Sequence, residues 1–331
     1  MKAAFINQPG PPESIQVGEL PKPKIGPRDA LVQVVATSVN PIDLYIRAGT
    51  VTMPLAYPYI IGSDLAGKVV EIGKECTRFK PGDRVWGSNQ GLLGRQGVTA
   101  EYAAVCEDWL YATPKEMTDA DAAAIALVGV TAHLGLFKHG NLKPGEKVYV
   151  PGGSGGVGSI VIQMAKAAGA SVATCAGSDE RVELCRNLGA DLALNYKTDD
   201  IVSELRGFAP EGIDVWFETQ REPNLEVSIP LLRRRGRMIL TAGRTALPTL
   251  PLGSFYTRDC SLFGFAMFNA TPQEQRVCAD AINAWSVEGK LRPLIGRTTP
   301  IDQAAAAHKL LEDNTLGRAG TLHGKIVIEV S

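Results

Sequence analysis

The sequence predicts an α/β protein that combines a doubly wound parallel sheet with a second, β-rich domain. Three observations lead to this prediction. A glycine-rich turn at 152–158 joins an apolar run to a helical pattern, strands and helices alternate from about residue 123 to 267, and short period-two apolar runs fill the first third. A chain of 331 residues is long enough for about two domains.

Composition and charge are those of an ordinary globular protein. Hydrophobic residues make up 45% of the chain, charged residues 21%, and the formal net charge is −1. A net charge so close to zero supplies no basic field for nucleic acid, so nucleic acid is not an expected partner. The chain starts without a long apolar region and has no run of about 18 apolar residues. We therefore expect no signal peptide, no membrane span and a cytoplasmic location.

The first third is expected to be mainly β. Residues 30–36 and 67–73 alternate in polarity, and 79–86 reads as a Pro-Gly turn followed by a strand. Such runs, separated by Pro and Gly, are typical of a partly closed barrel. An alanine-rich helical segment at 119–124 then marks a change of character.

The glycine turn is the centre of the second domain. The apolar run 148–150 predicts a buried strand, and Val157, Val161, Met164 and Ala168 recur at helical spacing. Between them, Gly153-Ser154-Gly155-Gly156-Val157-Gly158 fits the G-x-G-x-x-G pattern of a Rossmann dinucleotide site. Its glycines permit a sharp turn and close approach to a pyrophosphate, which the N–H groups of the following helix would bind.

Alternating elements follow this motif and predict parallel strands linked by helices. We place the dinucleotide-binding domain at residues 123–267. Its further elements are strands at 171–176, 192–195, 213–218, 237–241 and 261–264, and a helix at about 179–188.

The tail is expected to return to the first domain, which then comprises residues 1–122 and 268–331. It holds a helix at about 272–288 and a helical pattern at 301–311, for which Asp302 resembles an N-terminal signal. The final run, 324–330, reads as a single edge strand.

The segment after the second strand indicates which dinucleotide binds. An acidic residue in this region accepts hydrogen bonds from the ribose of NADH. Here the chain has Ala176-Gly177-Ser178, and Arg181 follows. A hydroxyl and a guanidinium favour the extra phosphate of NADPH. An alternative interpretation makes Ser178 a helix cap and Arg181 a solvated residue, and the two interpretations are compatible.

The motifs together carry a resemblance. The segments 39–47, 81–85, 142–146, 152–158 and 188–191 resemble the medium-chain dehydrogenase/reductase superfamily, and more narrowly its zinc-free quinone oxidoreductase, or zeta-crystallin-like, branch. The resemblance implies a GroES-like catalytic domain built from both ends of the chain and a Rossmann domain in the middle.

No metal site is expected. Zinc-dependent members of the superfamily carry a Cys where this chain has Asn40, and a Gly-His-Glu signature where it has Gly62-Ser63-Asp64. Catalytic zinc needs about three N or S protein ligands, and the thiolate and the imidazole are both missing. The six cysteines form no C-x-x-C pair, and the four histidines are widely separated.

The resemblance implies an NADPH:quinone oxidoreductase-like enzyme that reduces quinones or α,β-unsaturated carbonyls by hydride or single-electron transfer. By position, Asn40 and Tyr45 match cleft residues of this branch, with Tyr45 as a donor to the substrate oxygen. The structural alternative is that Asn40 and Asp43 form a turn and Tyr45 is packed.

Further residues are carried over to the cofactor site by the same resemblance. The family places a residue at the nicotinamide end where this chain has Thr131, and an aromatic near the adenosine phosphate where it has Tyr196. The remaining positions at the nicotinamide end are Gly243, Phe263, Phe265 and Lys325. For Lys325, a plain surface position is the alternative.

Two other functional classes stay open at this point. The chain could reduce simple aldehydes, or it could be a non-catalytic protein that binds NADPH, serves as a crystallin-like structural protein or binds RNA. The resemblance also implies a homodimer that pairs along the edge of the Rossmann sheet, for which the apolar stretch 261–268 is the candidate.

Overall fold

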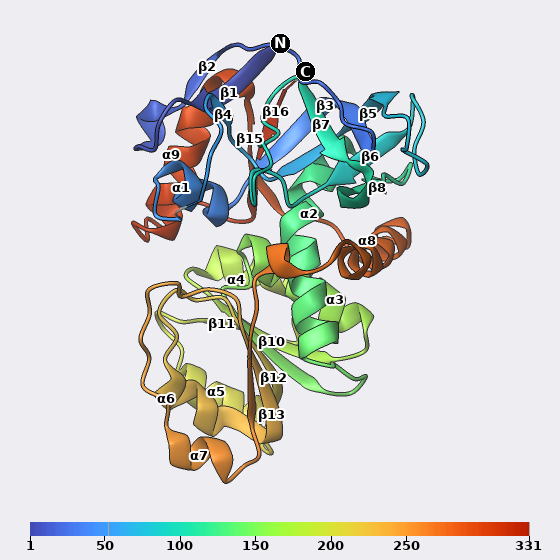
Figure 1. Cartoon of the computed structure of the whole chain (residues 1–331). Helices are drawn as coiled ribbons and strands as arrows, with labels where there is room; N and C mark the ends of the chain where they lie inside the picture. The colour runs from blue at the N-terminus through green and yellow to red at the C-terminus, as the bar shows by residue number, and fades with distance from the viewer. Residues whose placement is uncertain (52, 331) are drawn as a thin grey trace. The chain divides into compact units, whose positions relative to one another are not determined.

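The computed structural model of the chain describes residues 1–51 and 53–330 and contains two compact units (Figure 1). The domain boundaries proposed at 122/123 and 267/268 remain predictions. Unit 1 consists of Met1–Leu127, Ala270–Val287 and Arg292–Ser331, and unit 2 consists of Val128–Asn269 and Glu288–Leu291.

Unit 2 contains a six-stranded sheet in which all neighbouring strands are parallel, in the order β11-β10-β9-β12-β13-β14. This confirms the doubly wound sheet. Because β9 lies between β10 and β12, the chain leaves β9 first to one side and later returns to the other, which makes its carboxyl end the topological switch point. The strands are β9 (Lys147–Pro151), β10 (Ser171–Ala176), β11 (Leu192–Asn195), β12 (Ile213–Glu218), β13 (Leu232–Leu240) and β14 (Ser261–Gly264).

The helices of unit 2 cover both faces of this sheet. Helix α3 packs against β9 and β10. Leu205 and Leu225, from α5 and α6, join a core that contains Tyr149 and Trp216, whose ring centroids are 4.4 Å apart. Figure 1 shows α3 and α5 on opposite sides of the strands. The helices are α3 (Gly156–Ala167), α4 (Asp179–Asn187), α5 (Ile201–Phe208), α6 (Leu225–Ser228) and α7 (Leu252–Tyr256).

Unit 1 is β-rich, as expected. It contains a three-stranded sheet in the order β2-β1-β4 and a seven-stranded sheet in the order β15-β16-β3-β5-β6-β8, with β7 also paired to β3. The strands are β1 (Lys2–Ile6), β2 (Gln16–Glu19), β3 (Asp29–Val39), β4 (Tyr59–Ile60), β5 (Asp64–Ile72), β6 (Arg84–Gly87), β7 (Tyr102–Cys106), β8 (Leu110–Ala112), β15 (Ile295–Pro300) and β16 (Lys325–Glu329).

The last strand corrects one expectation. β16 pairs with β3 on one side and with β15 on the other, so it is an interior strand and not an edge strand. β16 lies in unit 1, and Figure 1 shows both chain termini at the same end of this unit. The second neighbour of β16, strand β15, could not be predicted from the sequence, because Gly296, Arg297 and Thr298 give β15 no apolar alternation.

The start of the last helix also differs from expectation. Helix α9 begins at Ala304, after a short 3-10 turn, and Asp302 does not cap it. The Asp302 carboxylate instead pairs with the Lys2 ammonium at 2.6 Å. The remaining helices are α1 (Pro41–Arg47), α8 (Pro272–Val287) and α9 (Ala304–Thr315) of unit 1, and α2 (Asp119–His133), which begins in unit 1 and ends in unit 2. The short turns are η1 (Pro12–Ser14), η2 (Glu107–Trp109), η3 (Leu134–His139, a π-helical turn), η4 (Ile229–Leu231), η5 (Met267–Asn269) and η6 (Ile301–Gln303).

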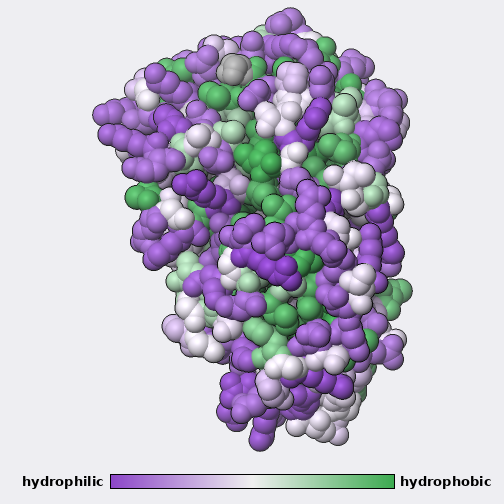
Figure 2. Space-filling model, turned by 180° about the vertical axis from the view of Figure 1, so that it is seen from behind, coloured by the Kyte–Doolittle hydropathy of each residue, from purple (hydrophilic) through white to green (hydrophobic). Residues whose placement is uncertain are grey.

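One helical stretch, Asp119–His139, is long and apolar enough to cross a membrane by length and composition alone. However, 78% of its most apolar window is buried inside the protein, as in the core helix of a globular fold. Figure 2 shows one face of the molecule, which is covered mostly by hydrophilic residues, with hydrophobic residues gathered in smaller areas between them.

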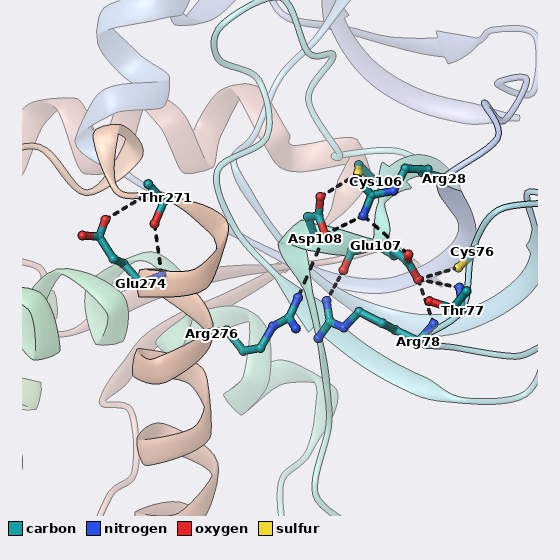
Figure 3. Close-up of polar contacts among 10 residues, drawn as sticks. All are labelled: Arg28, Cys76, Thr77, Arg78, Cys106, Glu107, Asp108, Thr271, Glu274 and Arg276. Atoms are coloured by element: carbon teal, nitrogen blue, oxygen red, sulfur yellow. Dashed lines mark hydrogen bonds and ion pairs between the residues drawn. The ribbon is translucent and has the colours of Figure 1, made fainter.

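A polar cluster attaches α8 to the first part of unit 1 (Figure 3). The Glu107 carboxylate accepts the backbone N–H groups of Thr77 and Arg78, each at 2.8 Å, and Asp108 lies 4.0 Å from Arg276 of α8. Burial raises the pKa of Glu107, but these N–H groups and the Cys76 thiol outweigh it and hold that pKa below its usual value.

The cysteines are free thiols in the part of the chain that the structure describes. Four of them are buried, whereas Cys76 and Cys106 are partly exposed beside Glu107 and Asp108. Burial and the neighbouring carboxylates raise the pKa of both thiols, which favours their protonated form.

Candidate active site

The glycine turn follows β9 directly and opens α3. Gly155 is the residue before the helix, and α3 begins at Gly156. A side chain at Gly153 would place its Cβ 2.2 Å from the Thr174 hydroxyl, and one at Gly158 would lie 2.4 Å from the Gly152 carbonyl oxygen. Only glycine fits these two positions, because strand, turn and helix are in contact there. The free N–H groups at the start of α3 can therefore approach an anionic ligand closely.

Thr219 also borders this turn, although sequence reasoning missed it. Its hydroxyl donates a hydrogen bond of 2.7 Å to the Pro151 carbonyl oxygen, just before the turn. The preceding residue, Glu218, is buried and accepts from the Trp216 indole at 3.1 Å and from the Gln220 N–H at 2.7 Å. Burial raises the pKa of Glu218. The signal that could have found Thr219 is its place after β12, the strand beside β9.

Three predicted cofactor residues meet at the carboxyl ends of β10 and β11. Ser178 caps α4, since its hydroxyl accepts the Arg181 N–H at 3.4 Å. Tyr196 follows β11, which is paired with β10 through Ala176 and Asn195. Its ring lies against Gly177: a Cβ there would be 2.5 Å from the Tyr196 hydroxyl oxygen. Ser178 is therefore a helix cap and at the same time a neighbour of Tyr196 and Arg181.

The other predicted cofactor residues of unit 2 lie on separate elements. Thr131 is buried in α2, and Gly243 follows β13 with φ +86°, a conformation that favours glycine. Phe263 lies in β14, and Phe265 follows it. The His139 ring stacks on Phe265 with centroids 4.6 Å apart.

In unit 1, Asn40 belongs to a fully buried polar network. Its side-chain amide donates to Asp64 Oδ2 at 2.7 Å, and its side-chain oxygen accepts the Lys325 ammonium. The Asn40 backbone N–H donates to Asp43 Oδ2 at 2.8 Å, in the manner of a capping box for α1. Ser63 donates to the other oxygen of Asp43. Thus the structure places Asn40 and Lys325 in direct contact, a pairing that sequence reasoning did not anticipate.

Burial dominates the electrostatics of this network. It raises the pKa of Asp43 to about 7, against the Ser63 hydrogen bond, which lowers it. Burial also raises the pKa of Asp64 and lowers that of Lys325, while the attraction between the two opposes both shifts. The ammonium lies 3.9 Å from Asp64 Oδ2 and donates to the Val39 carbonyl oxygen at 2.9 Å.

Tyr45 lies on α1, one turn beyond Asn40, and is half-buried. Within residues 1–51 and 53–330 its hydroxyl makes no hydrogen bond. A cavity of about 430 Å³ elsewhere in unit 1 is lined by residues of β15, η6, α9 and the segment before β16, among them Arg297, Gln303 and Leu310. None of the predicted site residues lines this cavity.

Asn40, Ser63 and Asp64 stand where zinc-dependent members of the superfamily carry their signature residues, and they do not fit zinc. They offer an amide, a hydroxyl and a carboxylate, and the carboxylate already faces an ammonium group. Zinc requires about three N, S or O ligands that are free to coordinate it. Among the described residues, no group of three or more His, Cys, Asp or Glu side chains could hold a metal ion.

Comparisons with known proteins match both parts of the chain. Residues 26–115 match the alcohol dehydrogenase GroES-like domain family, and residues 156–283 match the zinc-binding dehydrogenase family. The chain is 34% identical to a quinone oxidoreductase of Sus scrofa, over 99% of this chain and 97% of that protein. It is 31% identical to a 2-methylene-furan-3-one reductase of Solanum lycopersicum, over 92% of this chain and 73% of that protein.

Solved structures agree over nearly the full length. A structure described as an NAD-dependent alcohol dehydrogenase superposes with a TM-score of 0.90 at 29% identity and covers 100% of both chains. A mycobacterial protein complexed with NADPH superposes with a TM-score of 0.86 at 26% identity and covers 99% of both chains. With its parallel dinucleotide-type sheet, its β-rich unit and these relatives, the chain belongs to the medium-chain dehydrogenase/reductase superfamily, in its quinone oxidoreductase branch.

Proposed function

We propose that this protein is an NADPH-dependent, zinc-independent reductase of quinones or α,β-unsaturated carbonyls. The observation that carries the proposal is the glycine turn at the switch point of the sheet. It is supported by similarity to a quinone oxidoreductase over 97% of that protein and to a 2-methylene-furan-3-one reductase over 73% of that protein. The bound nicotinamide supplies the hydride. An electrophilic acceptor needs no metal to polarise it, so the protein mainly has to align the donor with the acceptor and exclude water.

We propose the following roles for individual residues. Gly153, Ser154, Gly155, Gly156, Val157 and Gly158 would hold the pyrophosphate at the start of α3. Tyr45 would donate a hydrogen bond to the acceptor oxygen, and Asn40, which is fully buried, would support it as the cap residue of α1. Thr131, Gly243, Phe263 and Phe265 are proposed for the nicotinamide side.

The enzymatic role is tested by following NADPH absorbance with a small panel of quinones, enones and aldehydes. We expect consumption with quinones or enones, and slower consumption with aldehydes because no strong acid accompanies the hydride donor. Consumption with none of them would instead support the alternative of a non-catalytic NADPH-binding or structural protein. Activity that survives dialysis against a chelator is expected as well, and its loss would contradict zinc independence.

The preference for NADPH is proposed from Ser178, Arg181 and Tyr196 at the ends of β10 and β11, where the Ser178 hydroxyl accepts the Arg181 N–H and the Tyr196 ring lies against Gly177. A guanidinium bound to a phosphate contributes about 1.5–3 kcal/mol, so Arg181→Ala should lower kcat/KM with NADPH roughly 10- to 100-fold. The value with NADH should change little. Arg186→Ala is the matched control, since Arg186 lies on the same helix and pairs with Glu183. Equal use of NADH and NADPH by wild type and Arg181→Ala would refute this assignment.

A homodimer is proposed through the stretch 261–268. Among the described residues its strand β14 pairs with β13 alone, so its other edge offers unpaired N–H and C=O groups for a second copy. Light scattering after size exclusion should give twice the mass of the chain at micromolar concentration, and a monomer would contradict the proposal.

A cytoplasmic location is also proposed, because six free thiols are typical of a reducing compartment.

A further inference from the structure

A buried polar cluster joins three distant parts of unit 1 at the end of β3. Val39, the last residue of β3, is paired with Ile326 of β16, and the start of β5 lies on the other side of β3. Asn40 follows β3 directly. The strand register therefore brings Asn40 together with Asp64 and Lys325, although Lys325 lies 285 positions further along the chain than Asn40. We call Asn40, Asp43, Ser63, Asp64 and Lys325 the Lys325 cluster.

The Lys325 cluster determines the orientation of the Asn40 side chain. An ammonium group can only donate hydrogen bonds, and an ionised carboxylate can only accept them. Lys325 must therefore face the amide oxygen of Asn40, while Asp64 must face its NH₂ group, as observed. Two further donors, Ser38 and Ser88, hold Asp64 at 2.8 and 2.6 Å. Asn40 thus has one orientation that satisfies all its neighbours.

Stability alone does not explain these charges. The Lys325 side chain is 5% exposed and that of Asp64 is 0% exposed. Taking both charges out of water is costly, and apolar side chains of similar volume often fill such a space at no loss of stability. What an apolar replacement could not supply is the directed hydrogen bond to Asn40. The cluster therefore serves to fix a geometry.

The element whose geometry it fixes is α1. This helix has only seven residues, too few to be stable without external contacts. Asn40 precedes its first turn, and the Asp43 carboxylate accepts a hydrogen bond from the Asn40 backbone N–H. Tyr45 lies one turn further on the same helix, half-buried, with a hydroxyl that makes no hydrogen bond within the described residues. A shift of the first turn would move this hydroxyl.

We propose that Lys325 is a positioning residue for the reaction: its ammonium, acting through Asn40, fixes the first turn of α1 and thereby the place of the Tyr45 hydroxyl. This inference rests on the proposed function, in which Tyr45 is the donor to the acceptor oxygen. It assigns Lys325 a role through Asn40 in place of direct contact with the nicotinamide. Lys325, Asp64 and Asp43 would thus act on turnover without touching the reactants.

The decisive experiment is a double-mutant cycle between Lys325→Met and Tyr45→Phe, with kcat, KM and the dissociation constant of NADPH measured for each variant. Misplacement of a donor by about 1 Å can cost up to 100-fold, so Lys325→Met alone should lower kcat roughly 10- to 100-fold. NADPH affinity should stay within about twofold of wild type, since only the transition state loses an interaction. Lys325→Arg, which keeps the charge, should retain part of the rate.

The cycle separates positioning from a general structural role. If Lys325 acts through Tyr45, Lys325→Met should cause no further loss of kcat in the Tyr45→Phe background. The same fold-loss in both backgrounds would overturn the proposal, as would weaker NADPH binding at unchanged kcat. Should Lys325→Met fail to fold, the double variant Lys325→Met/Asp64→Asn removes both charges together and is carried through the same cycle, with the same outcomes.

Hydrogen exchange tests the positioning of α1 without any turnover, so this inference can be tested separately from the proposed function. If the wild type reduces no acceptor in the panel, the proposed function fails, but the positioning of α1 can still be measured by hydrogen exchange. We expect the α1 amides to exchange at least about 10-fold faster in Lys325→Met, with α5 unchanged as an internal control. Unchanged exchange in α1 would overturn the positioning role. Lys309→Met, an exposed lysine on α9, is the control substitution.

Discussion

At the scale of single residues, Asp43 gives the clearest prediction of how stability depends on pH. Its carboxyl is buried, and burial raises its pKa from 3.8 to about 7. Because the folded state holds this proton more tightly than the unfolded state, its contribution to stability is fully present below about pH 4. That contribution is lost as the pH rises through 7. The titratable and polar groups that face this carboxyl are Asn40, Tyr59, Ser63, Asp64 and Lys325.

We therefore expect the free energy of unfolding of the wild type to fall between pH 4 and 7, relative to Asp43→Asn. The fall should be on the order of 2–4 kcal/mol, because Asn stays neutral at every pH and keeps an oxygen for the Asn40 N–H. Urea unfolding at pH 4.5, 6 and 7.5 measures it. Parallel profiles for the two proteins would show that the Asp43 carboxyl is not perturbed.

Whether the role of a single residue can be predicted from sequence depends on whether its contacts lie within one short segment. The glycines at 153 and 158 could be found from sequence, because their spacing reflects contacts within one strand, turn and helix. Ser178 could be found for the same reason. The partnership of Lys325 with Asn40 could not, since it arises from the register of β16 against β3 and leaves no trace in either local segment.

At the element scale, Ser178 connects helix stability to cofactor binding. It caps α4 through the Arg181 N–H, and Asp200 caps α5 in the same way through the Ser203 N–H at 3.1 Å. Replacing either cap by Ala should cost about 1 kcal/mol of stability. Only Ser178→Ala should also weaken NADPH binding, because only that cap adjoins Arg181 and Tyr196.

Thermal unfolding and NADPH titration of both variants measure these effects. Asp200→Ala is the matched control for the lost cap, since it removes the same kind of hydrogen bond from a helix of the same unit. Equal NADPH affinity in Ser178→Ala and Asp200→Ala would leave Ser178 with a capping role only.

The elements also differ in how well their sequences predicted them. Strands β9, β10 and β12 are buried along their length and read as apolar runs. β15 is mostly half-exposed and lacks alternation, so it was missed, and β16 was consequently misread as an edge strand. Asp302 resembled a helix cap because its neighbours have helical periodicity, but its ion pair with Lys2 depends on a contact 300 positions away.

On the scale of the whole molecule, the two units should respond differently to NADPH. Its proposed contacts lie mainly in unit 2, on the glycine turn and at the ends of β10 and β11. A ligand at 100 times its dissociation constant stabilises the state that binds it by about 2.7 kcal/mol. The slowest amides of β9 and β10 should therefore exchange roughly 100-fold more slowly with NADPH.

Hydrogen exchange with mass spectrometry checks this expectation, with β2 of unit 1 as an internal reference. Protection should be greatest in peptides from residues 147–176. Equal protection of β2 would contradict a site carried mainly by unit 2, and no protection anywhere would contradict NADPH binding.

The sequence by itself determined the dinucleotide half of this protein: a parallel sheet, a glycine turn that opens a helix, and a serine–arginine pair after the next strand. These features are local, since strand burial, helical spacing and glycine conformation are set by a few neighbouring residues. Tertiary structure decided the other half. It placed the last strand inside a sheet, where pairing with β3 and β15 brings an ammonium from residue 325 to the amide of residue 40. Such a contact depends on strand register across the whole chain, because a shift of one residue would turn Lys325 to the other face of the sheet.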